Sequence, residues 1–428
     1  MSEYITTSGD TFENISRKKY GVSNQASLIK NANPGVTEPL IAGVSLTIPA
    51  NPIKPNDLSQ NLSVIQNDET SIEIDGQIFK FWESLSIQDR FDGISSFKFN
   101  APFDSVFPAF KDIFKPFTYK PIQIYVGGET RFTGTVVAIR PTIEADRKAV
   151  SVSGYATPGV LQDCTPFAPN DDYQLEFVNV GVVDIAYSLG IPFGVQAIGG
   201  VGAADAAVFK QAVAIEPNER VMPFLAGLAR QRNLIISNDP SGELVFYQES
   251  PLPGSPDNVF GPSGLGQLAA TLEQGFQPLL DVSPSFREQE YYSHITALQP
   301  YLLGYRVRQF SVKNDRLPTV TRPYTFYAND AENIAQVQTT AKAKAGYMFA
   351  NAVEYSVEVN TWRTSTGQLW KVGDFISLKA PDAMIFNAYT FLIRGVNFIR
   401  TSTATKAVIN LVIPGSFSGK VPESMPWD

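Results

Sequence analysis

The chain is poor in the residues on which many enzyme active sites depend. Its 428 residues include one cysteine, Cys164, and one histidine, His294. A single cysteine excludes an intrachain disulfide and fits a reducing compartment. Catalysis by a nucleophile and a base usually needs a positioned histidine, but the alternating pattern around His294 predicts a partly buried strand residue. We therefore expect no catalytic residues of this class.

Motifs that hold metals or phosphates are also missing. Neither HExxH nor CxxC occurs, and no GxxxxGK is present. Gly199-Gly200-Val201-Gly202 lacks the spacing of a dinucleotide-binding turn and is interpreted as a flexible loop. We expect no cofactor, no metal and no enzyme activity. Paired carboxylates that hydrolyse a glycan stay open as an alternative, because the chain has 42 acidic residues.

Long apolar runs and an excess of positive charge are absent as well. No stretch approaches the roughly 18 apolar residues of a membrane helix, so we expect no membrane insertion. The start MSEYITTSGDTF has neither a basic cluster nor an apolar run, which argues against a secretory signal. Lys and Arg total 34 against 42 Asp and Glu, and this net charge of −8 disfavours a general nucleic-acid binder.

What is present is typical of a globular, mainly β protein. The chain is 43% hydrophobic and 12% aromatic, and its length predicts two to four domains. From about residue 70, alternation with period two and an Asp75-Gly76 turn indicate strands. The predicted parts are a first β-barrel at 68–165, a mixed α/β region at 166–290, a second β-barrel at 291–418 with a long helix at about 330–352, and a tail at 419–428.

The first fifty residues predict a separate small module. A short strand precedes Gly9-Asp10-Thr11, a turn that leads into a helix with Phe12 and Ile15 on one face. A second short helix ends before Asn33-Pro34-Gly35, and a strand closes the unit. The proline-rich residues 51–67 predict a linker.

An internal echo connects the two predicted barrels. Ile139-Arg140 is followed after seven residues by Lys148-Ala149-Val150, and Ile399-Arg400 is followed after five by Lys406-Ala407-Val408. In both places a strand enters a polar turn and a second strand. We interpret the echo as two related β-barrels on either side of the mixed region, with a chance match as the alternative.

The N-terminal residues resemble a LysM module. The matching positions occur in the family's order throughout the unit: Tyr4, Gly9-Asp10-Thr11, Ile15, Leu28, Asn31, Asn33-Pro34, Ile41, Gly43, Leu46 and Ile48-Pro49. Thr6 departs from the pattern, since this position is usually apolar. The resemblance implies two helices on a two-stranded sheet, with a groove between residues 9–12 and 33–36. Its candidate binding residues are Gly9, Asp10, Thr11, Phe12, Asn33 and Pro34. Protein docking is the favoured role of this groove, and binding of N-acetylglucosamine polymers or peptidoglycan is the alternative.

The rest of the chain, about 68–418, resembles the baseplate hub proteins of contractile-tail phages, of the Mu-like tail protein and late control protein D type. The segments that carry the resemblance are Val152-Ser153-Gly154-Tyr155, 161–164, 219–234, Gly242-Glu243-Leu244, Trp362, Gly367, Leu369-Trp370, Gly373-Asp374 and Val412-Ile413-Pro414. The resemblance implies a homotrimer with two barrels per subunit that forms a pseudo-sixfold ring.

The same resemblance implies partners and a location. The ring would connect the hexameric tail tube to the trimeric central spike and contact baseplate wedge or sheath-initiator proteins. DNA would pass through it without specific binding. The protein would be part of the virion tail baseplate, assembled in the cytoplasm of the host bacterium.

Two other functions remain open from the sequence. One is a cell-wall hydrolase that uses the LysM-like module for targeting, and the other is the hub of a secretion-system spike. Near the C-terminus, Trp427 is a candidate apolar anchor into a partner, with a disordered end as the alternative.

Overall fold

The computed structural model describes most of the chain, and it divides that chain into two compact units, Met1–Asn67 and Asp68–Asp428. The predicted linker at 51–67 lies outside the described residues, as does Gly9. The described residues are 2–7, 10–20, 26–49, 68–103, 108–144, 148–168, 174–200, 203, 208–249, 266–299, 308–317, 319, 321–328, 331, 333–417 and 424–428.

The N-terminal unit has the predicted order of strand, helix, helix and strand. Its elements are β1 (Ser2–Ile5), α1 (Phe12–Tyr20), α2 (Ala26–Ala32) and β2 (Ser45–Ile48). The two strands are antiparallel, with Tyr4 opposite Leu46. The small core between helices and strands consists of Phe12, Ile15, Ile29, Leu40, Leu46 and Ile48. The fold therefore agrees with the expectation for this unit, and its family stays a prediction.

The second unit is built around one 13-stranded sheet. Its strands run in the order β16-β20-β23-β22-β5-β6-β9-β8-β7-β3-β4, and β21 bridges β22 and β15. The strands from the first part of the unit are β3 (Thr70–Ile74), β4 (Gln77–Phe79), β5 (Ser84–Arg90), β6 (Ser96–Pro102), β7 (Pro121–Val126), β8 (Glu129–Ile143) and β9 (Lys148–Ala156). Those from the later part are β15 (Leu268–Glu273), β16 (Leu279–Phe286), β20 (Val353–Val359), β21 (Phe375–Ala380), β22 (Ile385–Thr401) and β23 (Thr405–Val412).

The two parts of this sheet repeat one strand order. Taking β4 aside, the first part is ordered β3-β7-β8-β9-β6-β5, and the second is ordered β15-β21-β22-β23-β20-β16. If the six strands of each part are lettered a to f in the order in which they occur along the chain, both parts have the spatial order a-d-e-f-c-b. One difference is that β3 pairs with β7 antiparallel while β15 pairs with β21 parallel. The predicted relation between the two halves is therefore supported at the level of topology.

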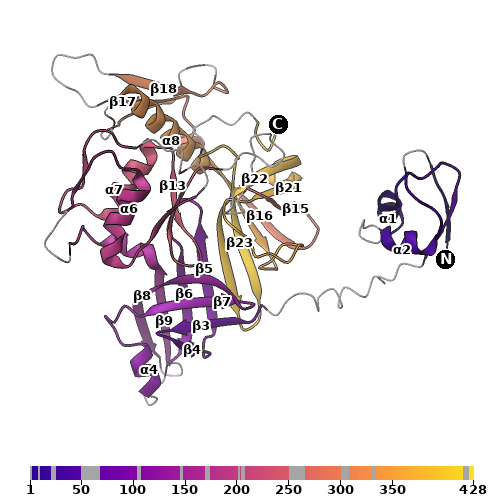
Figure 1. Ribbon diagram of the computed structural model, residues 1–428, viewed down its shortest axis with the longest axis horizontal. Helices are drawn as coiled ribbons and strands as arrows, with labels where there is room; N and C mark the ends of the chain where they lie inside the picture. Colours follow the sequence, from indigo (N-terminus) through magenta and orange to yellow (C-terminus); the bar gives the residue numbers. More distant parts are fainter. Residues whose placement is uncertain are drawn as a thin grey trace. The chain divides into compact units, whose positions relative to one another are not determined.

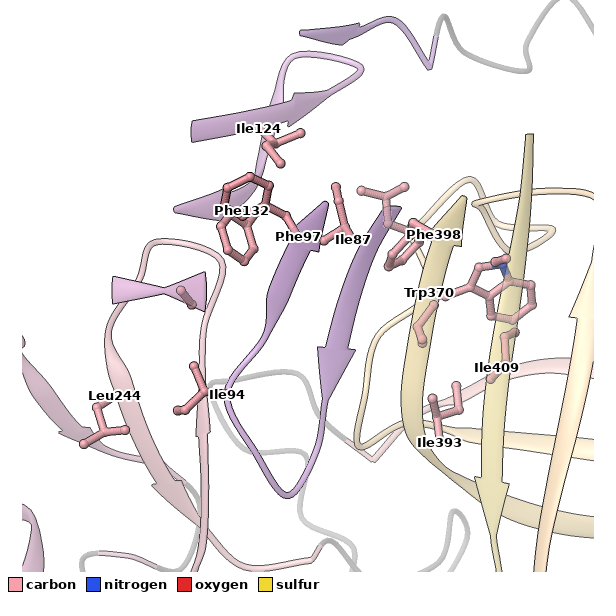
Figure 2. Close-up of a cluster of buried hydrophobic side chains, with 14 of the residues drawn as sticks. Ile87, Ile94, Phe97, Ile124, Phe132, Leu244, Trp370, Ile393, Phe398 and Ile409 are labelled. Atoms are coloured by element: carbon pink, nitrogen blue, oxygen red, sulfur yellow. The ribbon is translucent and has the colours of Figure 1, made fainter. Parts of the chain in front are cut away.

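The predicted boundaries need two corrections. The halves are not separate barrels, because β5 pairs with β22 and joins them in one sheet (Figure 1). The second half also begins at Leu268 rather than at 291, because β15 and β16 pair with β21 and β20. One buried core runs through both halves. Figure 2 shows its members from each side of the junction, among them Ile87 and Phe97 from the first half and Phe398 and Ile409 from the second.

The mixed region packs on the same core. It contains a small sheet ordered β11-β14-β13 and the two-stranded pair β10-β12. Helix α7 buries Val221, Leu225 and Leu228, whose spacing places them on one face of the helix. The elements are the short α5 (Val160–Asp163), β10 (Glu176–Phe177), α6 (Val182–Gly190), β11 (Ala197–Gly199), β12 (Val213–Ala214), α7 (Val221–Gln231), β13 (Ile235–Asn238) and β14 (Leu244–Tyr247).

Between β16 and β20 the second half carries a further three-stranded sheet and the long helix. The sheet is ordered β18-β17-β19, with strands β17 (His294–Leu298), β18 (Gln309–Lys313) and β19 (Pro323–Tyr327). Helix α8 (Ile334–Ala352) begins at the cap residue Asn333, whose side chain accepts the N–H of Gln336. A short helix, α4 (Pro108–Ile113), lies in the first half between β6 and β7.

Candidate functional site

The repeat extends to the register of individual residues. Strand β8 has a bulge at Val137, between the pairs Val136 with Gly154 and Ala138 with Ser153. Strand β22 has a bulge at Arg394, between the pairs that Ile393 and Gly395 form with β23. In each half, the pairing with the preceding strand ends two residues before the bulge. The last pair of β7 with β8 is Pro121 with Thr135, and the last pair of β21 with β22 is Phe375 with Leu392. A bulge fixes register locally, so these matches align the two halves residue by residue.

With the bulges aligned, the other strands follow. Val152 on β9 corresponds to Ile409 on β23, and Phe99 on β6 corresponds to Val357 on β20. On the last strand of each set, Leu85 of β5 corresponds to Val282 of β16. The corresponding residues on β9 and β23, Val152 and Ile409, are buried, and so are Phe99 on β6 and Val357 on β20.

The junction between the halves is an antiparallel pairing of β22 with β5. It runs from Gly395 opposite Arg90 to Thr401 opposite Ser84. The hydroxyl of Ser86 donates to Oδ1 of Asn397 at 2.7 Å. On the opposite face of the same strands, Ile87 and Phe398 are buried in the common core. This pairing removes the edge that each strand would otherwise present to solvent.

One buried and one half-buried ion pair flank this junction. Arg131 on β8 pairs with Asp89 on β5, and its guanidinium carbon lies 4.6 Å from the ring centroid of Phe398. Burial lowers the pKa of Arg131 to about 10, which still leaves the group charged at neutral pH. Arg394 pairs with Asp92 at 2.8 Å. Burial opposes the charge of Arg394, but the hydrogen bond to Asp92 and the negative charges of Asp92 and Glu354 together outweigh it and raise the pKa.

Among the open edges of the sheet, which include β4 and β15, two belong to strands whose counterparts in the other half are paired with each other at the junction. Within the described part of the chain, residues 138–143 of β8 pair only with β9, and β16 pairs only with β20. Both edges expose apolar side chains: Ile143 is 76% exposed, Leu280 49% and Phe286 38%. Both also contain a proline, Pro141 and Pro284. Proline is typical of edge strands because it lacks the N–H that an inner strand would donate.

In the N-terminal unit, the predicted groove residue Asp10 is part of the scaffold. Its carboxylate accepts the backbone N–H of Thr7 at 2.7 Å, the hydroxyl of Tyr4 at 2.9 Å and the ammonium of Lys18 at 2.8 Å. The hydrogen bonds from Lys18 and from Thr7 hold the pKa of Asp10 well below its usual range. These bonds fix the turn that leads into α1.

Phe12 and Asn33 also serve the fold. Phe12 is a core residue, and its N–H donates to the carboxylate of Glu38 at 2.7 Å. The amide of Asn33 donates to the carbonyl oxygens of Ile29 and Thr47 and accepts the N–H of Thr47, each within 2.8 Å. Asn33 therefore ties α2 to β2.

Of the predicted groove residues that the structure describes, Asp10 and Phe12 are buried, and Asn33 is half-buried with its amide occupied by internal bonds. Thr11 is half-buried and Pro34 is exposed. Thr6, which departs from the family pattern, is buried and uses its hydroxyl to bond Ile41 and Val44. Its polarity thus connects β1 to the loop before β2.

Near the C-terminus, Trp427 packs within its own chain. Its ring lies edge-on to Phe286 with centroids 5.3 Å apart, and Asp428 forms an ion pair with Arg316 at 2.5 Å. The neighbouring Met425 is buried. The tail is thus anchored on β16 of the same molecule, and a contact of Trp427 with a partner stays a prediction.

The structure gives the unique histidine a local role. His294 is half-buried in β17, and its ring nitrogen lies 3.3 Å from the hydroxyl of Ser293. Cys164 is a free thiol that ends α5. Among the described residues, no group of three or more His, Cys, Asp or Glu side chains is placed to hold a metal. In the same residues, no helix has the length and apolarity that crossing a membrane requires.

The two open edges were not predicted from the sequence. Residues 279–286 fall in the stretch interpreted as a mixed region, and no alternation of buried residues marks them. The available signal was the presence of Pro141 and Pro284 within strands.

Comparisons with known proteins point to phage tails. Residues 158–248 match the family described as baseplate hub protein gp44-like, second domain. This stretch covers much of the predicted mixed region, including α6, α7 and the sheet of β11, β13 and β14. The baseplate hub protein gp44 of Escherichia phage Mu is 20% identical over 322 residues, which cover 73% of this chain and 79% of that protein.

Solved structures share the fold. The 43 kDa tail protein of prophage MuSo2 from Shewanella oneidensis has a TM-score of 0.67 and 19% identity, over 81% of this chain and 99% of its own. The tail protein from Neisseria meningitidis MC58 has a TM-score of 0.65 and 20% identity, over 82% and 98%. Together the matches support a phage baseplate hub and tail protein of mainly β structure. The matched family is one of structural proteins, and no catalytic family is indicated.

Proposed function

We propose that this chain is the structural hub of a contractile-tail baseplate and that three copies form a pseudo-sixfold ring. The observation that carries the proposal is the repeated strand order, because it gives each copy two similar halves. Three copies then present six similar faces to a hexameric tail tube and three identical faces to a trimeric central spike. The ring thereby connects a sixfold tube to a threefold spike with copies of one chain.

The polar face of the junction suits a channel for DNA. On β5, β6, β9, β20, β22 and β23, the side chains opposite the core face are mostly small and polar, among them Ser86, Lys98, Ser153, Ser356, Asn397 and Asn410. Lys406 on this face is paired with Glu358 at 2.9 Å. A surface with few uncompensated cations does not hold phosphates strongly, so DNA would pass without specific binding.

Solution mass and imaging test the ring. We expect light scattering to show an assembly with three copies of this chain, either for the protein alone or after tail-tube protein is added. Electron microscopy should show a ring with threefold symmetry and six similar lobes. A protein that stays monomeric in both conditions would overturn the proposal.

For the N-terminal unit we propose docking onto neighbouring baseplate proteins, such as wedge or sheath-initiator proteins. Asp10, Phe12 and Asn33 are occupied by internal contacts, so few polar groups of the predicted groove remain for a sugar. We expect no binding of N-acetylglucosamine oligomers or peptidoglycan in calorimetry. Saturable binding that Thr11→Ala weakens would instead favour the glycan role.

The proposed location is the virion tail baseplate, with assembly in the host bacterial cytoplasm. A virion-associated signal in purified particles, for example from an antibody against this chain, would test the location.

A further inference from the structure

Two of the open edges of the sheet are the counterparts of the two strands that pair inside the chain. Aligned by their bulges, β8 corresponds to β22, and β16 corresponds to β5. The second half thus offers its β22 to the β5 of the first half, and that pairing is made. The equivalent pairing would join residues 138–143 of β8 in the first half to β16 in the second half. Within the described residues of one chain, these two strands do not pair with each other.

The alignment also gives a register for the missing pairing. Inside the chain, Asn397 lies opposite Gln88. The counterpart of Asn397, three residues after the bulge, is Arg140, and the counterpart of Gln88 is Ser285. Arg140 would therefore lie opposite Ser285 wherever the two edges meet.

We propose that residues 138–143 of one copy pair antiparallel with residues 282–287 of the next copy. In this register Ile139 lies opposite Phe286 and Ile143 opposite Val282. The inference rests on the proposed ring and identifies the edges that close it. Because the two edges differ, the contact is head-to-tail, and such a contact closes into a ring when the rotation between copies is right.

The side chains on the two edges agree with this pairing. Ile139 and Ile143 lie on one face of β8, and Val282 and Phe286 lie on one face of β16. At the junction inside the chain, the equivalent face of β22 and β5 holds the buried Val396, Phe398, Leu85 and Ile87. Pairing between copies would cover Ile143 and Phe286, which are exposed in the single chain and stand where the junction has the charged Arg400 and Asp89.

The prolines and charges limit the contact to the intended partner. Pro141 and Pro284 fall opposite each other, so this pair contributes no N–H to the ladder. Beyond Ile143, the next pair would be Glu144 and Asp281, whose like charges oppose further pairing. An edge with an interrupted ladder pairs poorly with unrelated strands, which protects the free subunit from aggregation. Because the backbone contributes fewer hydrogen bonds here, the choice of partner depends more on how well the side chains of the two edges fit.

Disulfide trapping tests the register. In a Cys164→Ser background, Arg140→Cys and Ser285→Cys are introduced together. Residues opposite each other in antiparallel strands have Cα atoms about 4.5 to 5.5 Å apart, within the range that a disulfide spans. We expect mild oxidation to yield covalent trimers on a denaturing, non-reducing gel.

The chain offers matched controls. Asn397→Cys with Gln88→Cys is the equivalent pair inside one chain and should oxidise within a monomer. Arg140→Cys with Asp281→Cys is displaced by four residues, or about 14 Å, and should not crosslink. A trimer by light scattering without crosslinks at 140 and 285 would overturn this pairing and leave the ring intact. A monomer throughout would overturn the ring and the pairing with it.

A second variant needs no oxidation. Ile143→Lys places a charge on the 76% exposed side chain that the contact would bury, so the trimer should dissociate at protein concentrations at least about tenfold higher than the wild type requires. Ile78→Lys changes a 62% exposed isoleucine on β4 and serves as the control. Equal dissociation of both variants would count against the proposed edges.

Discussion

At the scale of single residues, Asp374 shows how burial changes a carboxylate. It stands immediately before β21, is 6% exposed, and accepts the N–H groups of Gly266 and Gln267 at 3.1 and 3.2 Å. Burial raises the pKa of Asp374 to about 6, although the two hydrogen bonds act in the opposite direction. The charged form is therefore less stable in the folded protein than in the unfolded chain.

Replacing Asp374 by Asn tests this effect. A carboxyl whose folded pKa is about 6 and whose unfolded pKa is about 3.9 favours folding when protonated, so its contribution to stability falls as pH rises from about 4 to about 6. Relative to Asp374→Asn, the wild type should lose on the order of 2 to 3 kcal/mol across this window. Urea unfolding of both proteins at pH 4 and pH 7 measures the difference. Parallel stability profiles would contradict the assignment.

The ion pair of Arg131 and Asp89 is a second case at the residue scale. Arg131→Met leaves Asp89 buried without its partner and should lower the free energy of unfolding by about 3 to 5 kcal/mol. Adding Asp89→Leu removes the unpaired charge and should recover part of that loss. A double-mutant cycle by urea unfolding measures the coupling. Additive effects of the two changes would show that the pair does not act as a unit.

Single residues were also where sequence reasoning was least complete. Asp10 and Asn33 were correctly placed near turns, but the sequence does not reveal that Lys18 and Thr47 occupy their polar groups. Those partners are 8 and 14 residues away, and their approach depends on how the helices pack. Polar residues at turns predict capping and binding equally well until the packing is known.

At the scale of elements, the close approach of β8 and β9 depends on Gly154. A Cβ at this position would overlap the backbone carbonyl of Thr135 and the ring of Phe97. Gly154→Ala should therefore destabilise the unit by about 1 to 3 kcal/mol, because backbone and core must both move. Gly93→Ala is the control, since its Cβ would meet only the flexible side chain of Arg90 at 3.4 Å. Thermal unfolding of both variants decides, and equal melting temperatures would contradict the expectation.

Elements with regular periodicity were predicted well. The long helix expected at about 330–352 is observed as Ile334–Ala352, and it buries Val337, Ala341, Ala345 and Phe349. Ile334, in the first turn of this helix, is 38% exposed. Strand β16 was missed because it is an edge strand whose side chains are mostly exposed, so it lacks the alternation that identifies a strand.

At the scale of the whole molecule, the internal echo located the right hairpins but misaligned them. The sequence match placed Ile139 against Ile399, whereas the bulges place Ile139 against Val396. Register in a hairpin is set by bulges and turn length, which leave no reliable mark in residue identity. The relation between the halves was therefore predictable, and the pairing of their strands across β5 and β22 was not.

The division into two units leads to a prediction about the whole chain. Because Met1–Asn67 and Asp68–Asp428 form separate compact units with separate cores, a chain that begins at Asp68 should fold and retain the trimer. Its melting temperature should match that of the main transition of the full chain, measured by calorimetry. The shortened chain should lose only the docking proposed for the N-terminal unit, seen as lost capture of a wedge or sheath-initiator protein by the immobilised ring. A shortened chain that is monomeric or aggregated would instead place part of the ring contact in the first unit, since the open edges of β8 and β16 are retained in it.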